Sequence, residues 1–210
     1  MAKSIIFCLV IIFASFYYYM GFHSKIQVQE INFPPKIILF KEYLGDYKNL
    51  NTAFKTLEEE ISQLETKNYQ EFGMYYDDPN LMENPTQARA IIGVLLDIKE
   101  RHIAGKFLVD HADYRINENS ELNCLSVTFP YRNELSMFWV ISKVYPAIVE
   151  YGKTNKFFTK GNTIGALEIY HYKNTEKTIE VVFPYGPEVD KLLLNRAPKP
   201  IYKNKKNSDL

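Results

Sequence analysis

Hydrophobic and polar residues alternate most regularly over residues 124–129. A period of two along the chain is typical of a strand that buries one face. After a turn at 130–132, the run 135–141 is apolar at nearly every position and contains Trp139. Because a helix with so little polar surface must be covered on most sides, we predict that this strand and a helix over 133–151 form the packing nucleus.

The region before this nucleus predicts two strands and an amphipathic helix. Residues 26–31 and 34–40 read as strands with a break between them. Over 46–66, apolar residues recur at the spacing of one helical face. These residues are Leu50, Phe54, Leu57, Ile61 and Leu64. The acidic run 58–60 fits the solvated face opposite this stripe better than an acid site.

Further strands are indicated by runs of β-branched and aromatic residues between turn signals. They cover 72–76, 90–96, 105–109, 165–170 and 177–183. The last two predict a hairpin, and the Pro-Tyr-Gly-Pro turn at 184–187 closes the domain.

The two halves of the chain show the same order of predicted elements. Tyr43 precedes helix 46–66 as Tyr131 precedes helix 133–151, and each helix is followed by two strands. Such internal similarity indicates the duplication of one strand-helix-strand-strand unit. Two such units predict an α+β domain with helices on one side of an antiparallel sheet and a cleft between the halves.

The N-terminal run 5–22 is uncharged and mostly apolar. As a helix rising about 1.5 Å per residue it would extend ~27 Å, close to the hydrocarbon thickness of a bilayer. The tyrosines at 17–19 fit an interfacial aromatic belt. A cleaved signal peptide is the alternative, but the candidate cleavage sites place Phe13 or Phe22 three residues before the cut, where a small residue is expected.

The orientation of this segment is indicated by charge. Lys25, Lys36 and Lys41 follow the apolar run, and the positive-inside rule then places the domain on the cytosolic side. The sequence has no usable N-glycosylation sequon, since Asn84 is followed by proline, which agrees with that side.

The predicted fold class is therefore α+β, with an N-terminal transmembrane helix followed by the duplicated domain. We assign residues 1–25 to the anchor and 26–187 to the domain, with halves of about 26–115 and 120–187. Residues 188–210 are rich in lysine, asparagine and proline and predict a short disordered tail.

The composition argues against several classes of function. With 25 basic and 25 acidic residues the net charge is zero, which gives no electrostatic basis for a nucleic-acid partner. Cys8 lies in the N-terminal run and Cys124 in the nucleus, so a disulfide within the domain and a thiolate zinc site are excluded.

No motif in the sequence indicates catalysis. The four histidines lack metal-ligand spacing, and there is neither a glycine-rich phosphate loop nor a Gly-x-Ser-x-Gly elbow. The acidic pair 77–78 precedes a proline and fits turn chemistry. We therefore expect no metal, no cofactor and no enzymatic activity.

Three short motifs carry a resemblance to a known family. They are Tyr-Tyr-Asp-Asp-Pro at 75–79, Phe-Pro-Tyr at 129–131 and Leu-Glu-Ile-Tyr at 167–170. Their order and spacing resemble the GyrI-like superfamily, the effector-binding domains of bacterial transcription activators and of a gyrase-inhibitory protein. Over residues 1–187 the chain is more similar to the membrane-anchored, testis-expressed ER-phagy receptor family, which carries such a domain.

The resemblance implies a single-pass protein of the endoplasmic reticulum membrane whose domain faces the cytosol and binds a protein partner from the autophagy machinery. Its function would be selective autophagy of the endoplasmic reticulum. One departure affects this role, because the family's receptor carries an aromatic-x-x-aliphatic motif in a long acidic tail. In the tail 197–210, Tyr202 is followed by Lys-Asn-Lys instead.

The alternative function is a small-molecule-binding domain with weak or no catalysis. Glu168 is a carboxylate in an otherwise apolar and aromatic strand, where its pKa would shift or where it would meet a cationic ligand. The residues predicted to line a ligand pocket are Tyr43, Tyr76, Tyr131, Glu168 and Tyr170.

Overall fold

The computed structural model describes residues 2–158, 165–172 and 176–203. The strands are β1 (Gln29–Phe33), β2 (Ile37–Leu44), β3 (Tyr69–Tyr75), β4 (Arg89–Leu96), β5 (Arg115–Glu118), β6 (Leu122–Pro130), β7 (Ala166–His171) and β8 (Thr178–Pro184). The α-helices are α1 (Ala2–Tyr19), α2 (Leu50–Ile61), α3 (Arg101–Asp110), α4 (Leu135–Trp139) and α5 (Tyr145–Thr154). A π-helical turn, η4 (Val140–Val144), joins α4 to α5, and short 3-10 turns include η1 (Tyr47–Asn49) and η5 (Val189–Leu192).

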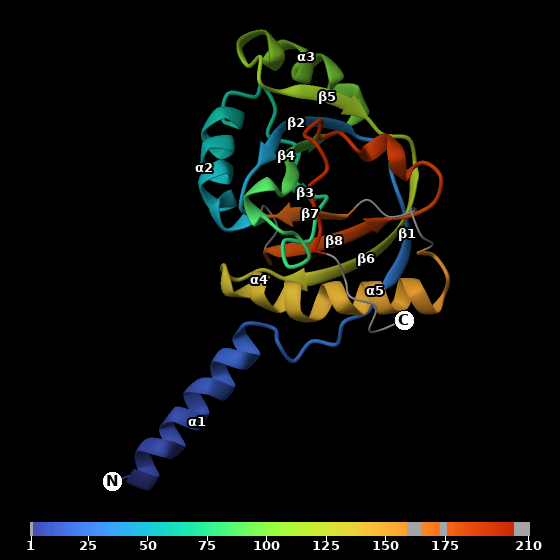
Figure 1. Ribbon diagram of the computed structural model, residues 1–210. Helices are drawn as coiled ribbons and strands as arrows, with labels where there is room; N and C mark the ends of the chain where they lie inside the picture. The colour runs from blue at the N-terminus through green and yellow to red at the C-terminus, as the bar shows by residue number, and fades with distance from the viewer. Residues whose placement is uncertain (1, 159–164, 173–175, 204–210) are drawn as a thin grey trace.

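One curved antiparallel sheet carries the fold, with the strand order β1-β6-β8-β7-β3-β4-β2-β5 (Figure 1). In the first half β4 pairs with both β2 and β3, and in the second half β8 pairs with both β6 and β7. The halves meet where β3 pairs with β7. This arrangement confirms the predicted α+β class and is the one expected of a duplicated unit.

Both faces of the sheet are buried, because side chains alternate between two separate core regions. On β4, Ile91 and Leu95 point into the concave face, where they pack with residues of β1, β6, β7 and β8. Ile92 and Val94 point to the convex face and pack against α2 and α3. The helices α4 and α5 cover the same convex face over the second half of the sheet.

The predicted helix 133–151 contains a break that the periodicity does not reveal. Pro146 has no N–H to donate to the carbonyl four residues earlier, and the π-helical turn η4 ends two residues before it. Val140, Val144 and Ile148 still face the sheet.

The expectation that the apolar run 135–141 is covered on most sides is wrong. Leu135, Phe138 and Ile141 are exposed, because they lie on the side of α4 and η4 that faces away from the sheet. Trp139 is half-buried, and its ring stacks on Phe22 with the ring centroids 4.4 Å apart.

The first segment after α1 folds back onto the domain. The helix ends at Tyr19, Met20 is buried, and Gly21 adopts a left-handed conformation (φ 74°) against Pro130. Within the described part of the chain, no helix has both the length and the apolar character needed to cross a membrane. The predicted transmembrane segment 5–22 is therefore corrected: the helix stops before Phe22, which instead packs on Trp139.

Two other segments differ from the sequence expectation. Residues 105–109, predicted as a strand, lie in α3, where Ala104 and Phe107 are buried. The signal for this helix is an Asp-x-x-Glu capping box, in which the Asp97 side chain and the Glu100 side chain satisfy each other's backbone N–H groups.

Residues 188–203, which the sequence analysis assigns to a disordered tail, pack on the domain. Val189 and Leu192 are buried, and Leu192 closes the concave core. The Asn195 side chain donates to the carbonyl oxygens of Tyr43 (2.9 Å) and Ala90 (2.6 Å).

A matched pair of phenylalanines tests the packing. Phe129→Ala should lower the free energy of unfolding by about 3 to 5 kcal/mol, since Phe129 is 2% exposed in the convex core. Phe138→Ala removes the same atoms from a side chain that is 70% exposed and should change stability by less than about 0.5 kcal/mol. Urea unfolding of both variants measures the difference, and equal losses would show that α4 is placed wrongly.

Candidate functional site

The central feature of the convex face is a buried carboxylate, that of Glu168 on β7. The residue is 2% exposed. Its Oε1 accepts a hydrogen bond from the Tyr145 hydroxyl (2.6 Å), and its Oε2 accepts one from the Tyr170 hydroxyl (2.9 Å). None of the ion pairs formed within the described ranges involves this residue. The negative charge is therefore held by phenols and not by a cation.

A glycine on the neighbouring strand makes room for a third phenol. Gly73 lies directly opposite Glu168 in the β3–β7 pairing. A Cβ atom at Gly73 would lie 2.7 Å from the Tyr75 hydroxyl, closer than real contacts allow. The absence of that atom lets the Tyr75 ring lie over the strand, with its hydroxyl 3.5 Å from that of Tyr170. We call Glu168, Tyr75, Tyr145 and Tyr170 the Glu168 cluster.

The π-helical turn η4 determines the position of the Tyr145 phenol. Tyr145 is the first residue of α5 and directly follows the π-helical turn η4. A π turn adds a residue to the helical circuit and so rotates the residues that follow it relative to a regular helix. Tyr145 thereby points at the sheet, packing edge to face on Phe183 with centroids 5.5 Å apart and reaching the carboxylate.

More aromatic rings surround the cluster. Tyr170 contacts three of them, and Tyr75 contacts one. The rings are Phe54 (5.6 Å), Tyr131 (6.0 Å) and Tyr172 (5.5 Å) around Tyr170, and Tyr47 (5.2 Å) at Tyr75, all measured between centroids. Aromatic faces attract organic cations, so the surroundings of this carboxylate favour a positively charged, apolar group.

Burial determines the protonation of these groups. Desolvation raises the pKa of the Glu168 carboxyl, and the hydrogen bonds from the tyrosines oppose that shift without cancelling it. Burial and the nearby Glu168 charge raise the pKa of each cluster tyrosine well above its usual value. The phenols therefore remain hydrogen-bond donors, while the carboxylate is a site that gains from a proton or a cation.

Three of the five predicted pocket residues meet here: Glu168, Tyr170 and Tyr131. The other two do not. Tyr76 points to the concave face, where its hydroxyl donates to the carbonyl oxygen of Leu192 (2.8 Å). Tyr43 lies on β2, three strands from β7 and thus roughly 14 Å away, and its hydroxyl donates to the carbonyl oxygen of Asp46 (2.7 Å).

Two cluster residues were not among the predicted pocket residues, Tyr75 and Tyr145. Adjacent strand residues point to opposite faces, so only one of the residues at 75 and 76 can reach Glu168, and the pairing of β3 with β7 decides which one. For Tyr145 the available signal was the following proline, Pro146, which predicts a helix irregularity.

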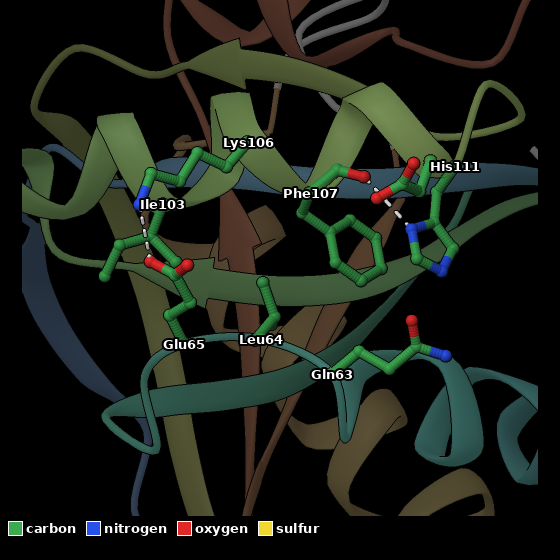
Figure 2. A pocket seen from close by; sticks show the side chains of 8 residues that line it. Gln63, Leu64, Glu65, Ile103, Lys106, Phe107 and His111 are labelled. Atoms are coloured by element: carbon green, nitrogen blue, oxygen red, sulfur yellow. Dashed lines mark hydrogen bonds and ion pairs between the residues drawn. The ribbon is translucent and has the colours of Figure 1, made fainter.

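A separate hollow lies between the end of α2 and α3 (Figure 2), with a volume of about 140 Å³. Several of its polar groups already have partners: Lys106 Nζ lies 2.9 Å from Glu65, and the His111 Nδ1–H donates to the carbonyl oxygen of Phe107 (3.0 Å). No three His, Cys, Asp or Glu side chains are grouped as metal ligands in the described part of the chain. The hollow therefore offers weaker chemistry than the Glu168 cluster.

Comparison with known proteins gives likeness in fold only. No family model and no curated protein sequence matches the chain. Several solved structures do match the chain. The crystal structure of the EcmrR C-terminal domain matches with a TM-score of 0.53 and 12% identity, over 77% of this chain and 98% of that one.

Two further structures match similarly. EcmrR in its cryo-EM complex with DNA matches with a TM-score of 0.52 and 12% identity, over 87% of this chain and 68% of that one. An uncharacterized conserved protein from Listeria innocua matches with a TM-score of 0.50 and 12% identity, over 79% and 95%. At 12% identity, these matches show a shared fold and nothing about the role of the chain. They give no support to the ER-phagy receptor family or to a role in autophagy.

The pKa shift of Glu168 predicts a pH dependence of stability. Its folded pKa lies above the unfolded value of about 4.5, so the folded state binds the proton more tightly and loses relative stability as pH rises from about 4.5 through the folded pKa. Glu168→Gln removes this loss, and the variant should gain stability relative to the native chain as pH increases. Urea unfolding between about pH 4 and pH 8 measures the effect.

Glu180→Gln on β8 is the matched control. Burial alone would raise the pKa of Glu180, but hydrogen bonds from His171 and Ser126 bring it below the usual value. This carboxylate stabilises the fold above the unfolded pKa, and its replacement should cost stability near neutral pH. The same pH trend in both variants would contradict the assignment of Glu168.

Proposed function

We propose that the chain is a ligand-binding domain that accepts a lipophilic organic cation with aromatic groups at the Glu168 cluster. The observation that carries this proposal is the buried carboxylate bound by two phenols, with no basic partner in the described part of the chain. An ionised carboxylate held this way is costly to bury. A cation brought against it would recover that cost, and aromatic rings around it would add to the attraction.

Charge and shape both restrict the ligand. A strongly hydrated cation such as an ammonium ion would lose its water shell on reaching a site enclosed by aromatic rings. A delocalised cation with phenyl substituents loses little hydration and packs against Phe54, Tyr131 and Tyr172. The ligand class is therefore an apolar monocation, and the phenols orient the carboxylate that receives it.

Binding requires movement of side chains, since Glu168 is closed off from solvent. Tyr172, which is 36% exposed, and the half-buried Tyr131 form the outer boundary of the aromatic shell. Both follow the ends of strands, where the backbone has fewer constraints than within the sheet. The binding-competent state is one in which these rings have swung outward, and the ligand selects it.

A pair of probes with the same shape and opposite charges tests this function. Tetraphenylphosphonium should bind the native chain, and tetraphenylborate should not, in isothermal titration calorimetry. Glu168→Gln should weaken binding of the cation at least tenfold, a loss of about 1.4 kcal/mol or more. Glu180→Gln, which changes a carboxylate on the concave face, should leave the affinity unchanged.

Two results would overturn the proposed function. One is equal affinity of the native chain and Glu168→Gln for the cation, and the other is equal affinity of the native chain for both probes. Affinity should also decrease as pH falls through the raised pKa of Glu168, because the protonated carboxyl no longer attracts the cation.

We further propose that the chain lies at the endoplasmic reticulum membrane with its domain in the cytosol. The support is the exposed apolar surface of α1, where the successive residues Ile5, Ile6 and Phe7 are all more than half exposed. Successive residues point in different directions around a helix, so a protein partner on one side of α1 would leave the apolar side chains on its other sides in water. Contact with lipid on all sides would cover these apolar side chains. Such contact requires that α1 inserts into the bilayer without crossing it.

Vesicle flotation tests the membrane contact. The full chain should float with neutral phosphatidylcholine vesicles, and deletion of residues 2–19 should abolish flotation. A full chain that stays in the bottom fraction would contradict the proposal. Protease treatment of intact microsomes should digest the domain, and protection of the domain would reverse the assigned side.

A further inference from the structure

We propose that the C-terminal strap, residues 195–203, is a latch coupled to the Glu168 cluster, so that binding of the cation releases the strap and release of the strap favours binding. This inference rests on the proposed function. It concerns a different part of the molecule, the contact between Tyr202 and the buried pair Asp77 and Arg89.

The latch is the hydrogen bond between the Tyr202 hydroxyl and the buried ion pair of Asp77 and Arg89, which we call the seat. The Arg89 side chain donates a hydrogen bond to each carboxylate oxygen of Asp77 (2.9 Å each). The Arg89 backbone N–H also donates to Asp77 Oδ2 (2.9 Å). The Tyr202 hydroxyl donates to Asp77 Oδ1 at 2.6 Å. Burial alone would raise the pKa of Asp77, but Arg89 and Tyr202 bring it below its usual value, so the seat stays charged.

The strap is held at its two ends. Asn195 is buried and donates to two backbone carbonyls of the sheet. Near the other end the backbone pairs briefly with the loop after β3: the Glu83 N–H donates to the Ile201 carbonyl (3.0 Å), and the Lys203 N–H donates to the Leu81 carbonyl (2.8 Å).

The middle of the strap makes few bonds. Pro198 and Pro200 have no N–H to donate and keep the segment extended. The Tyr202 end can therefore detach while Asn195 remains in place.

Tyr47 connects the seat to the ligand site. Its hydroxyl donates to the carbonyl oxygen of Arg89 (2.5 Å) and accepts from the backbone N–H of Asp77 (3.4 Å). Its ring packs edge to face on Tyr75 of the Glu168 cluster, with centroids 5.2 Å apart. One side chain thus contacts both the latch seat and the ring beside the carboxylate.

Tyr47 is also held less firmly by secondary structure than the cluster tyrosines. Tyr75 and Tyr170 belong to the two central strands and Tyr145 to a helix, whereas Tyr47 lies on the short 3-10 turn η1. A cation that displaces Tyr75 must shift Tyr47, which breaks both of its hydrogen bonds to the Asp77 and Arg89 backbone. Since coupling between two sites is reciprocal, loss of the latch must raise affinity by the factor by which binding weakens the latch.

The ligand-free test uses hydrogen exchange of the Glu83 and Lys203 amides, whose bonds hold the strap. Tyr47→Phe keeps the ring and removes the hydroxyl, and it should accelerate their exchange at least threefold. Tyr114→Phe is the control, because it also removes a tyrosine hydroxyl, one that donates to Glu60 and not to the strap or its contacts. Equal effects of the two variants, or no effect of Tyr47→Phe, would overturn the latch connection.

The ligand test adds tetraphenylphosphonium. Saturating probe should accelerate exchange of the same amides in the native chain, and Tyr202→Phe should bind the probe at least threefold more tightly, with folding checked by circular dichroism. Tyr114→Phe should bind as the native chain does. Binding without a change in strap exchange overturns the latch and leaves the proposed function intact. Absence of binding in every variant overturns both.

Discussion

The junction between β3 and β7 determines how the two halves of this protein are joined and what lies between them. Five residue pairs connect the strands, with Gly73 opposite Glu168 at the centre. A side chain at position 73 would exclude the Tyr75 ring and leave the carboxylate with one fewer neighbour. The position of the Tyr75 ring beside the carboxylate therefore depends on glycine at position 73.

That face combines tight packing with an unneutralised charge, two properties that usually exclude each other. Helices α2 and α5 and the sheet bury the carboxylate, while hydrogen bonds from phenols keep it satisfied in the absence of a basic residue. The concave face, by contrast, is an ordinary apolar core closed by Leu192. Apolar packing on both faces of the sheet therefore supports the fold around this one buried carboxylate.

The sequence predicted the α+β class, the strand-helix-strand-strand order of each half and Glu168, because alternation along a strand and an acidic residue among aromatic ones are local signals, but it missed α3 and β5. It did not predict which of Tyr75 and Tyr76 faces Glu168, since the face depends on strand pairing. The apolar run 135–141 also led us to expect that Phe138 is buried, whereas its side chain points away from the sheet. The contacts of Asn195 and Tyr202 were missed because both reach residues more than 100 positions away.

Glycine at position 73 also keeps a second charged side chain away from the position directly opposite Glu168. Positions 73 and 168 are directly opposite each other in the β3–β7 pairing, so a carboxylate at position 73 would lie beside that of Glu168 on the same face of the sheet. Two like charges at cross-strand distance cannot both ionise at low cost. The pairing of glycine with glutamate therefore leaves one carboxylate, not two, in the central cross-strand pair where the two similar halves meet.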